Sequence, residues 1–152
     1  MGSAADAFGH TSDGLEGTWK LVSASSRTSA GEPCEGPYGP SPVGFLTYTR
    51  DGRVAALISY GGRKPLPFGG GTQEEQAVAF KTFLAYAGRY SISGENVTHY
   101  IEVSSIQNYV GRELVRSLKF QGDRIILTTP PTMVNGIIQT VELIWQRLQI
   151  SS

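Results

Sequence analysis

A histidine lies on the apolar face of a predicted β-strand. In ENVTHYIEVSS (95–105) the side chains alternate, and His99 shares one face with Val97, Ile101 and Val103. Burying an imidazole in such a face costs free energy unless another group forms a hydrogen bond with it. His99 therefore belongs either to a polar network inside a filled core or to a cavity that a ligand can enter.

An arginine occupies the same face of the next predicted strand. ELVRSLKFQ (113–121) places Arg116 beside Leu114, and a symmetric turn about residues 108–109 would bring Arg116 close to His99. Arginine stays charged and is rarely buried without a partner, yet the inward faces of the predicted strands contain no aspartate or glutamate. We therefore favour a cavity in which Arg116 meets water or an anionic or carbonyl ligand.

These residue types point to acid–base chemistry without a cofactor. A neutral His99 would accept a proton while Arg116 and a tyrosine stabilise the resulting oxyanion, which is sufficient for isomerisation, cyclisation or dehydration. The candidate catalytic residues are His99, Arg116 and Tyr90. The candidate substrate-binding residues are Tyr48, Tyr86, Gln139, Ile58, Ile101 and Phe120.

A binding or carrier module is the alternative function. In a carrier the same side chains would only orient a small hydrophobic molecule with a polar or carbonyl end. We favour catalysis, because an arginine beside a histidine and tyrosines is chemically richer than a carrier needs. We expect no cofactor and no metal, since the two histidines and the only cysteine, Cys34, lack metal-ligand spacing and no phosphate-binding loop is present.

Short alternating runs separated by turn residues must position these side chains. Eight predicted strands cover residues 17–25, 43–50, 53–60, 86–93, 97–105, 113–121, 124–130 and 137–148. The links RDGR, SGEN and QGDR are tight turns that predict hairpins, so the strands follow one another as a meander. Such an all-β chain can close into an eight-stranded, up-and-down antiparallel barrel whose interior holds side chains or one small ligand.

One segment departs from the β pattern. Thr72 is followed three residues later by Glu75, and the apolar residues after them have helical spacing, which predicts a short helix over 73–84 between the third and fourth strands. The Gly- and Pro-rich segments before the second strand and before this helix are predicted loops. Both loops are long enough to cover an opening of the barrel.

Composition and charge limit the classes of function. The chain has 152 residues, with 13 Lys plus Arg balancing 13 Asp plus Glu, and neither sign forms a run, so we expect no nucleic-acid partner. It has no long apolar stretch and no leader, which favours a cytoplasmic protein without a membrane role. We expect a flexible N-terminal arm over residues 1–14 and one domain over 15–152. Self-association into a homodimer stays open.

Several sequence blocks resemble the small bacterial and fungal lipocalin-like domain family. LEGTW supplies Gly17 and Trp19, similar to the lipocalin Gly-x-Trp signature, and WQRL supplies Arg147, similar to the arginine that lies against that tryptophan. Further blocks that resemble the family are GPSPVGFLTYTRDGRV, FLAYAGRYSI, VTHYIEVSSIQNYVG and LVRSLKFQGDRIILTTPP.

The resemblance covers residues 15–148 and implies a calycin-type β-barrel. It also implies a place among proteins that act as cyclases and isomerases in specialised-metabolite pathways. The chain departs from other lipocalins in three ways: its helix lies between strands three and four instead of after the eighth, and their disulfide and secretion signal are missing. Secreted carrier roles are therefore not implied.

Overall fold

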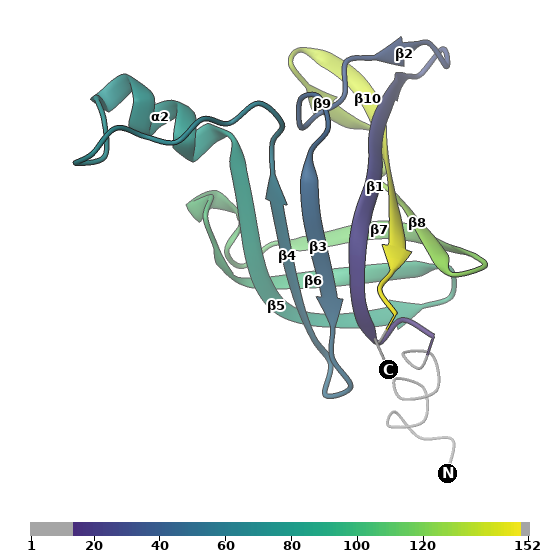
Figure 1. Ribbon diagram of the computed structural model, residues 1–152. Coiled ribbons are helices and arrows are strands. Elements are labelled where there is room, and N and C mark those ends of the chain that lie inside the picture. The colour runs from purple at the N-terminus through teal and green to yellow at the C-terminus, as the bar shows by residue number, and fades with distance from the viewer. Residues whose placement is uncertain (1–13, 150–152) are drawn as a thin grey trace.

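The chain forms a closed antiparallel barrel of eight strands, as predicted. The computed structural model describes residues 14–149, so the predicted arm over 1–14 lies outside the described residues apart from Gly14. The barrel strands are β1 (Gly17–Thr28), β3 (Val43–Tyr48), β4 (Arg53–Ser59), β5 (Phe83–Ser93), β6 (Asn96–Ser104), β7 (Glu113–Gln121), β8 (Arg124–Thr128) and β10 (Ile137–Arg147). Each strand pairs with the next, and β10 pairs with β1 to close the barrel. This is the predicted meander (Figure 1).

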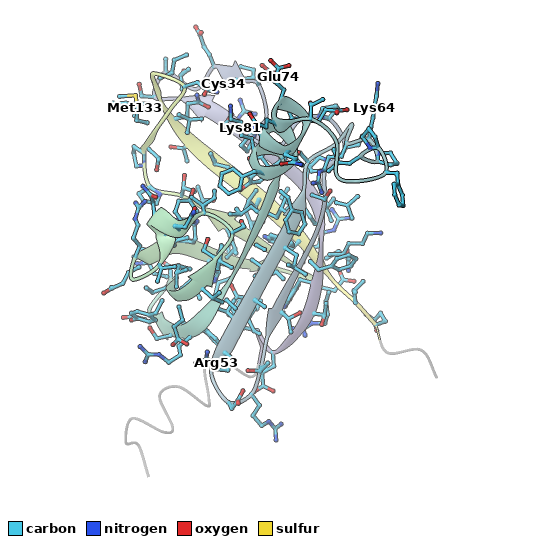
Figure 2. All side chains as sticks on the ribbon, turned by 90° about the vertical axis from the view of Figure 1, so that its left-hand side faces the viewer. Cys34, Arg53, Lys64, Glu74, Lys81 and Met133 are labelled. Carbon is cyan, nitrogen blue, oxygen red and sulfur yellow. The ribbon has the colours of Figure 1, made fainter. Side chains whose placement is uncertain are left out.

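The two ends of the barrel differ. Short turns join β3 to β4, β5 to β6 and β7 to β8 at one end, while every long connection lies at the other end, which we call the mouth. The mouth also holds two short strands, β2 (Pro33–Cys34) on β1 and β9 (Thr132–Val134) on β10, and the 3-10 turn η1 (Gln107–Tyr109). Figure 2 shows Cys34 and Met133 together at this end, with Arg53 at the opposite end.

A tryptophan and an arginine plug the end opposite the mouth. Trp19 is 1% exposed, and its indole Nε1 donates a hydrogen bond to the Leu15 carbonyl at 2.9 Å. The Arg147 guanidinium lies 4.2 Å from the Trp19 ring centroid and donates to the carbonyls of Glu16 and Gly14. This end of the barrel is therefore closed by side chains.

The helix α2 (Gln73–Lys81) lies between β4 and β5 and carries the predicted capping box. The Thr72 hydroxyl accepts a hydrogen bond from the Glu75 amide at 3.1 Å, and the Glu75 carboxylate accepts one from the Thr72 amide at 2.8 Å. The predicted end at residue 84 is wrong, because Leu84 pairs with Ile58 of β4 as part of β5. Sheet pairing there replaces the helical hydrogen bonds. None of the helix residues is buried, and α2 lies beside the barrel rim (Figure 1).

An irregularity in the β5–β6 pairing changes which side chains face inward. The register shifts between Ala87, opposite Val103, and Gly88, opposite Ile101. Because of this bulge Val103 is 61% exposed, so its predicted inward position is wrong. A Cβ at Gly88 would lie 1.8 Å from the Tyr100 carbonyl oxygen, so only glycine lets the two strands approach this closely.

The barrel interior otherwise follows the predicted alternation. The buried apolar residues form one cluster that includes Trp19, Leu46, Val54, Ile58, Val97, Ile125, Leu127 and Trp145. His99 is buried among them at 2% exposure. Within residues 14–149, no helix is long and apolar enough to cross a membrane.

Candidate functional site

Two tyrosines hold the buried histidine. The hydroxyl of Tyr48, at the end of β3, lies 2.6 Å from Nε2 of His99, and the hydroxyl of Tyr86, on β5, lies 2.6 Å from Nδ1. Strand alternation turns all three side chains inward from β3, β5 and β6. Both imidazole nitrogens are thus hydrogen-bonded within the protein, which offsets the free-energy cost of burying His99.

Burial keeps this Tyr48–His99–Tyr86 network uncharged. Desolvation, and then the positive charge of Arg116, lower the pKa of His99 to about 3. Desolvation also raises the pKa of Tyr48 and of Tyr86 well above the usual value for tyrosine. At neutral pH the network therefore consists of a neutral imidazole and two protonated phenols.

Arg116 lies diagonally across from His99 on the neighbouring strand. Arg116 pairs with Val97 in the β6–β7 ladder, and His99 pairs with Leu114. One residue pair lies between these two pairs, so both side chains point to the same face of the sheet. Its Nη1 donates to the Val115 carbonyl at 3.0 Å. None of the ion pairs between described residues involves Arg116. A half-buried guanidinium thus faces the interior without a carboxylate.

A small inner compartment of the barrel adjoins this network. It has a volume of about 80 Å³, and Tyr86, His99 and Arg116 line it. Its apolar lining includes Leu46, Ala56, Ile58, Leu127 and Trp145.

A larger cavity, the vestibule, lies at the mouth and adjoins the inner compartment. Its volume is about 980 Å³. The residues that line both spaces are Tyr38, Leu84, Tyr109, Leu114, Arg116 and Leu143. Arg116 therefore lies at the boundary, within reach of a molecule that occupies the vestibule.

Two tyrosines of the cavity wall were not identified from the sequence. Tyr38 comes from the loop between β2 and β3, and Tyr109 from the turn η1. The Tyr38 ring packs edge-on against Tyr60 at 5.3 Å between centroids, and desolvation raises the pKa of Tyr38 to about 12. Neither residue lies in an alternating run, so periodicity gave no signal for them.

The loop that carries Tyr38 is fastened to the end of β4. The Gly61 amide donates to the Tyr38 carbonyl at 3.2 Å, and a Cβ at Gly61 would lie 1.3 Å from the Pro40 carbonyl oxygen. Glycine at 61 is therefore required for this loop to pack against the barrel. This contact places Tyr38 over the inner compartment.

Neither compartment is lined by four of the predicted site residues, which are Tyr48, Tyr90, Ile101 and Gln139. Tyr90 is buried next to Tyr48, with ring centroids 4.7 Å apart, and its hydroxyl donates to the Thr49 carbonyl at 3.2 Å. Ile101 is buried at 3% exposure. Gln139 is 5% exposed and its Nε2 donates to the Val134 carbonyl at 3.0 Å.

Phe120 does not lie at the predicted site. It is 49% exposed near the end of β7, far along the strand from Arg116 toward the closed end, and its ring is the nearest group to the Cβ position of Gly14. Strand alternation predicts its side of the sheet but not its height in the barrel. Ile58, by contrast, lines the inner compartment.

Two buried polar atoms lack a hydrogen-bond partner among the described residues: Nε1 of Trp145 and Oε1 of Gln139. Trp145 also lines the inner compartment, but its N–H itself is fully buried. The part of the chain that the structure describes contains no group of three or more His, Cys, Asp or Glu placed to hold a metal ion.

Comparisons with known proteins place the chain in a family. The family model described as a lipocalin-like domain matches residues 16–148. The 4'-hydroxy-3'-methoxypropiophenone carrier protein ppsC of Aspergillus oryzae is 39% identical over 87 residues, covering 51% of this chain and 78% of its own length. Among solved structures, the crystal structure of Rv2717c from M. tuberculosis aligns over 97% of this chain and 99% of its own, with 12% identity and a TM-score of 0.36.

Proposed function

Since the chain belongs to the lipocalin-like domain family, we propose that its barrel binds a small hydrophobic molecule whose polar end enters the inner compartment. The observation that carries the proposal is the position of Arg116: a guanidinium with no carboxylate partner among the described residues lies where the vestibule meets the inner compartment. A ligand oxygen would supply the partner that the barrel does not.

The two volumes fit different parts of such a ligand. Small-molecule sites commonly measure roughly 300–1,000 Å³, which the vestibule reaches at about 980 Å³. The inner compartment, at about 80 Å³, has room for a functional group but not for a whole ligand. The apolar body of the ligand therefore occupies the vestibule, and its polar group lies beside Tyr86 and Arg116.

The name of the relative supports an aromatic ketone as the ligand class. The Aspergillus oryzae protein is named a carrier of 4'-hydroxy-3'-methoxypropiophenone, a hydrophobic aryl ketone with one carbonyl and one phenol group. A ketone carbonyl accepts hydrogen bonds from a phenol or a guanidinium. We therefore assign this chain a binding or carrier function toward molecules of similar chemistry.

Cofactor-free isomerisation, cyclisation or dehydration of the bound molecule is the second candidate function. It is favoured by the Tyr48–His99–Tyr86 network beside Arg116, because these groups could stabilise an oxyanion and move a proton. Both His99 nitrogens already bond to tyrosines, so a proton would reach the imidazole through a phenol hydroxyl. A carrier needs no such relay.

Calorimetric titration of the full chain with 4'-hydroxy-3'-methoxypropiophenone tests the binding function. Arg116→Gln should weaken binding by about tenfold or more, because a hydrogen bond to a charged group contributes roughly 1.5–3 kcal/mol. Lys119→Gln is the matched control, since it removes one positive charge from an outward position of the same strand. Binding that is absent, or that is equal in wild type and Arg116→Gln, would contradict the proposal.

Product analysis separates the carrier from the enzyme. Wild-type protein is incubated with the ketone and with related hydrophobic carbonyl compounds, followed by mass and chiral analysis. An isomeric or dehydrated product that disappears in His99→Ala would establish catalysis. Tight binding with every compound recovered unchanged would establish the carrier.

A further inference from the structure

We propose that the inner compartment is a hydrogen-bond-donor site for a carbonyl oxygen, with Tyr86 as its principal donor and with Tyr48 and His99 as positioning residues that orient the Tyr86 hydroxyl. The proposal rests on the proposed binding function and deepens it, because it states which chemical group the inner compartment takes. It follows from counting the hydrogens of the Tyr48–His99–Tyr86 network.

The network holds one more hydrogen than it can use internally. A neutral imidazole has one N–H donor and one nitrogen acceptor. One tyrosine hydroxyl must therefore donate to His99, and the other must accept from it. The accepting hydroxyl keeps its own hydrogen free for a third group.

Burial decides which tyrosine donates. Tyr48 is 1% exposed, and His99 Nε2 is the only hydrogen-bond partner that its hydroxyl has among the described residues. If Nε2 carried the proton, the Tyr48 hydrogen would remain unpaired in the core, and an unsatisfied buried donor is costly. Tyr48 therefore donates to Nε2, and the proton of the imidazole lies on Nδ1.

Tyr86 is then the tyrosine with the free hydrogen. Its hydroxyl oxygen accepts from Nδ1–H at 2.6 Å, and Tyr86 lines the inner compartment whereas Tyr48 does not. The free O–H is thus available to a molecule that enters the compartment. A phenol that accepts one hydrogen bond also becomes a better donor of the next.

Arg116 is a second donor in this wall. Its guanidinium contributes N–H groups only, and it lines the boundary between the inner compartment and the vestibule. No carboxylate lines the compartment. A carbonyl oxygen has two lone pairs and no hydrogen, so it can accept from both the Tyr86 hydroxyl and Arg116.

The tautomer of His99 tests the hydrogen count without any ligand. In the ligand-free chain labelled with ¹⁵N-histidine, the nitrogen chemical shifts at pH 7 should show Nδ1 protonated and Nε2 unprotonated. A His10→Ala variant identifies the signals of His99, since the chain has two histidines. Tyr48→Phe should allow a population with the proton on Nε2. A wild-type protein with the proton on Nε2 overturns the proposal.

Carbonyl infrared spectroscopy tests the donor role of Tyr86. With 4'-hydroxy-3'-methoxypropiophenone labelled with ¹³C at its carbonyl, the stretching frequency of the bound ketone should be lower in wild type than in Tyr86→Phe. The ketone should bind Tyr86→Phe about three- to tenfold more weakly, the range for loss of one hydrogen bond. Tyr100→Phe, which removes an outward hydroxyl bonded to Ser91 on the same sheet, is the matched control.

The outcomes distinguish this inference from the proposed function. A bound ketone whose frequency is the same in wild type and Tyr86→Phe overturns the donor role while leaving the binding function intact. Failure of the ketone to bind wild type counts against the proposed function, and the His99 tautomer then decides the hydrogen count alone.

Discussion

Acid should destabilise this barrel through one residue, His99. Its side chain is buried at 2% exposure and its pKa is lowered from 6.5 to about 3, first by desolvation and then by Arg116. Because the pKa is lower in the folded than in the unfolded chain, the unfolded chain binds more protons below pH 6.5. Stability from the neutral imidazole is therefore complete above pH 6.5 and is lost as the pH falls toward 3.

The size of the loss follows from the same pKa difference. A pH of 5 lies about 1.5 units below the pKa of His99 in the unfolded chain, and each unit corresponds to about 1.4 kcal/mol. The free energy of unfolding should therefore be about 2 kcal/mol lower at pH 5 than at pH 7 because of His99. Hydrogen bonds from Arg53 and Arg89 lower the pKa of Glu102 further below 4.5, so its titration begins only at more acid pH.

Urea denaturation at pH 7 and pH 5 measures the effect. Wild type should lose about 2 kcal/mol of unfolding free energy, and His99→Gln should lose far less, because an amide can donate to one tyrosine and accept from the other without titrating. The arm histidine, His10, is common to both proteins and cancels in the comparison. Equal losses in wild type and His99→Gln would refute this account of the buried imidazole.

Three further substitutions test particular packing contacts. Gly88→Ala should destabilise the barrel by about 3 kcal/mol or more in urea denaturation, because its Cβ would lie 1.8 Å from the Tyr100 carbonyl oxygen; a smaller change would show that β5 and β6 can separate cheaply. In Gly61→Ala the added Cβ would lie 1.3 Å from the Pro40 carbonyl oxygen, so the loop at the mouth should be displaced. The free energy of ligand binding should then fall by more than the free energy of unfolding. Calorimetric titration measures the first loss and urea denaturation the second. Arg147→Ala should cost about 2–3 kcal/mol by removing the contact with the closed-end tryptophan and the hydrogen bonds to two carbonyls, with ligand affinity unchanged within about twofold.

Local patterns in the sequence determined the barrel. Alternation of apolar and polar residues depends only on the period of an extended chain, and the Gly- and Asp-containing turns depend on residues that adopt tight turns, so both can be recognised without the fold. The capping box of α2 is equally local. For the same reason the inward positions of His99, Arg116 and Tyr86 were predicted correctly, since each follows from its place in one strand.

Tertiary structure decided everything that depends on two segments meeting. Pairing with β4 brought Leu84 into a strand, and the bulge opposite Gly88 turned Val103 outward. The local sequence pattern around these two residues indicates neither outcome. The height of Phe120 in the barrel and the place of Tyr38 over the cavity likewise depend on how strands and loops pack.

The hydrogen bonds of His99 belong to this second group. Its partners, Tyr48 and Tyr86, lie 51 and 13 residues away in the chain. Strand alternation in the sequence predicts that all three side chains point inward. Only closure of the barrel, which sets the distance and relative height of the strands, joined them into one network and left the Tyr86 hydrogen facing the cavity.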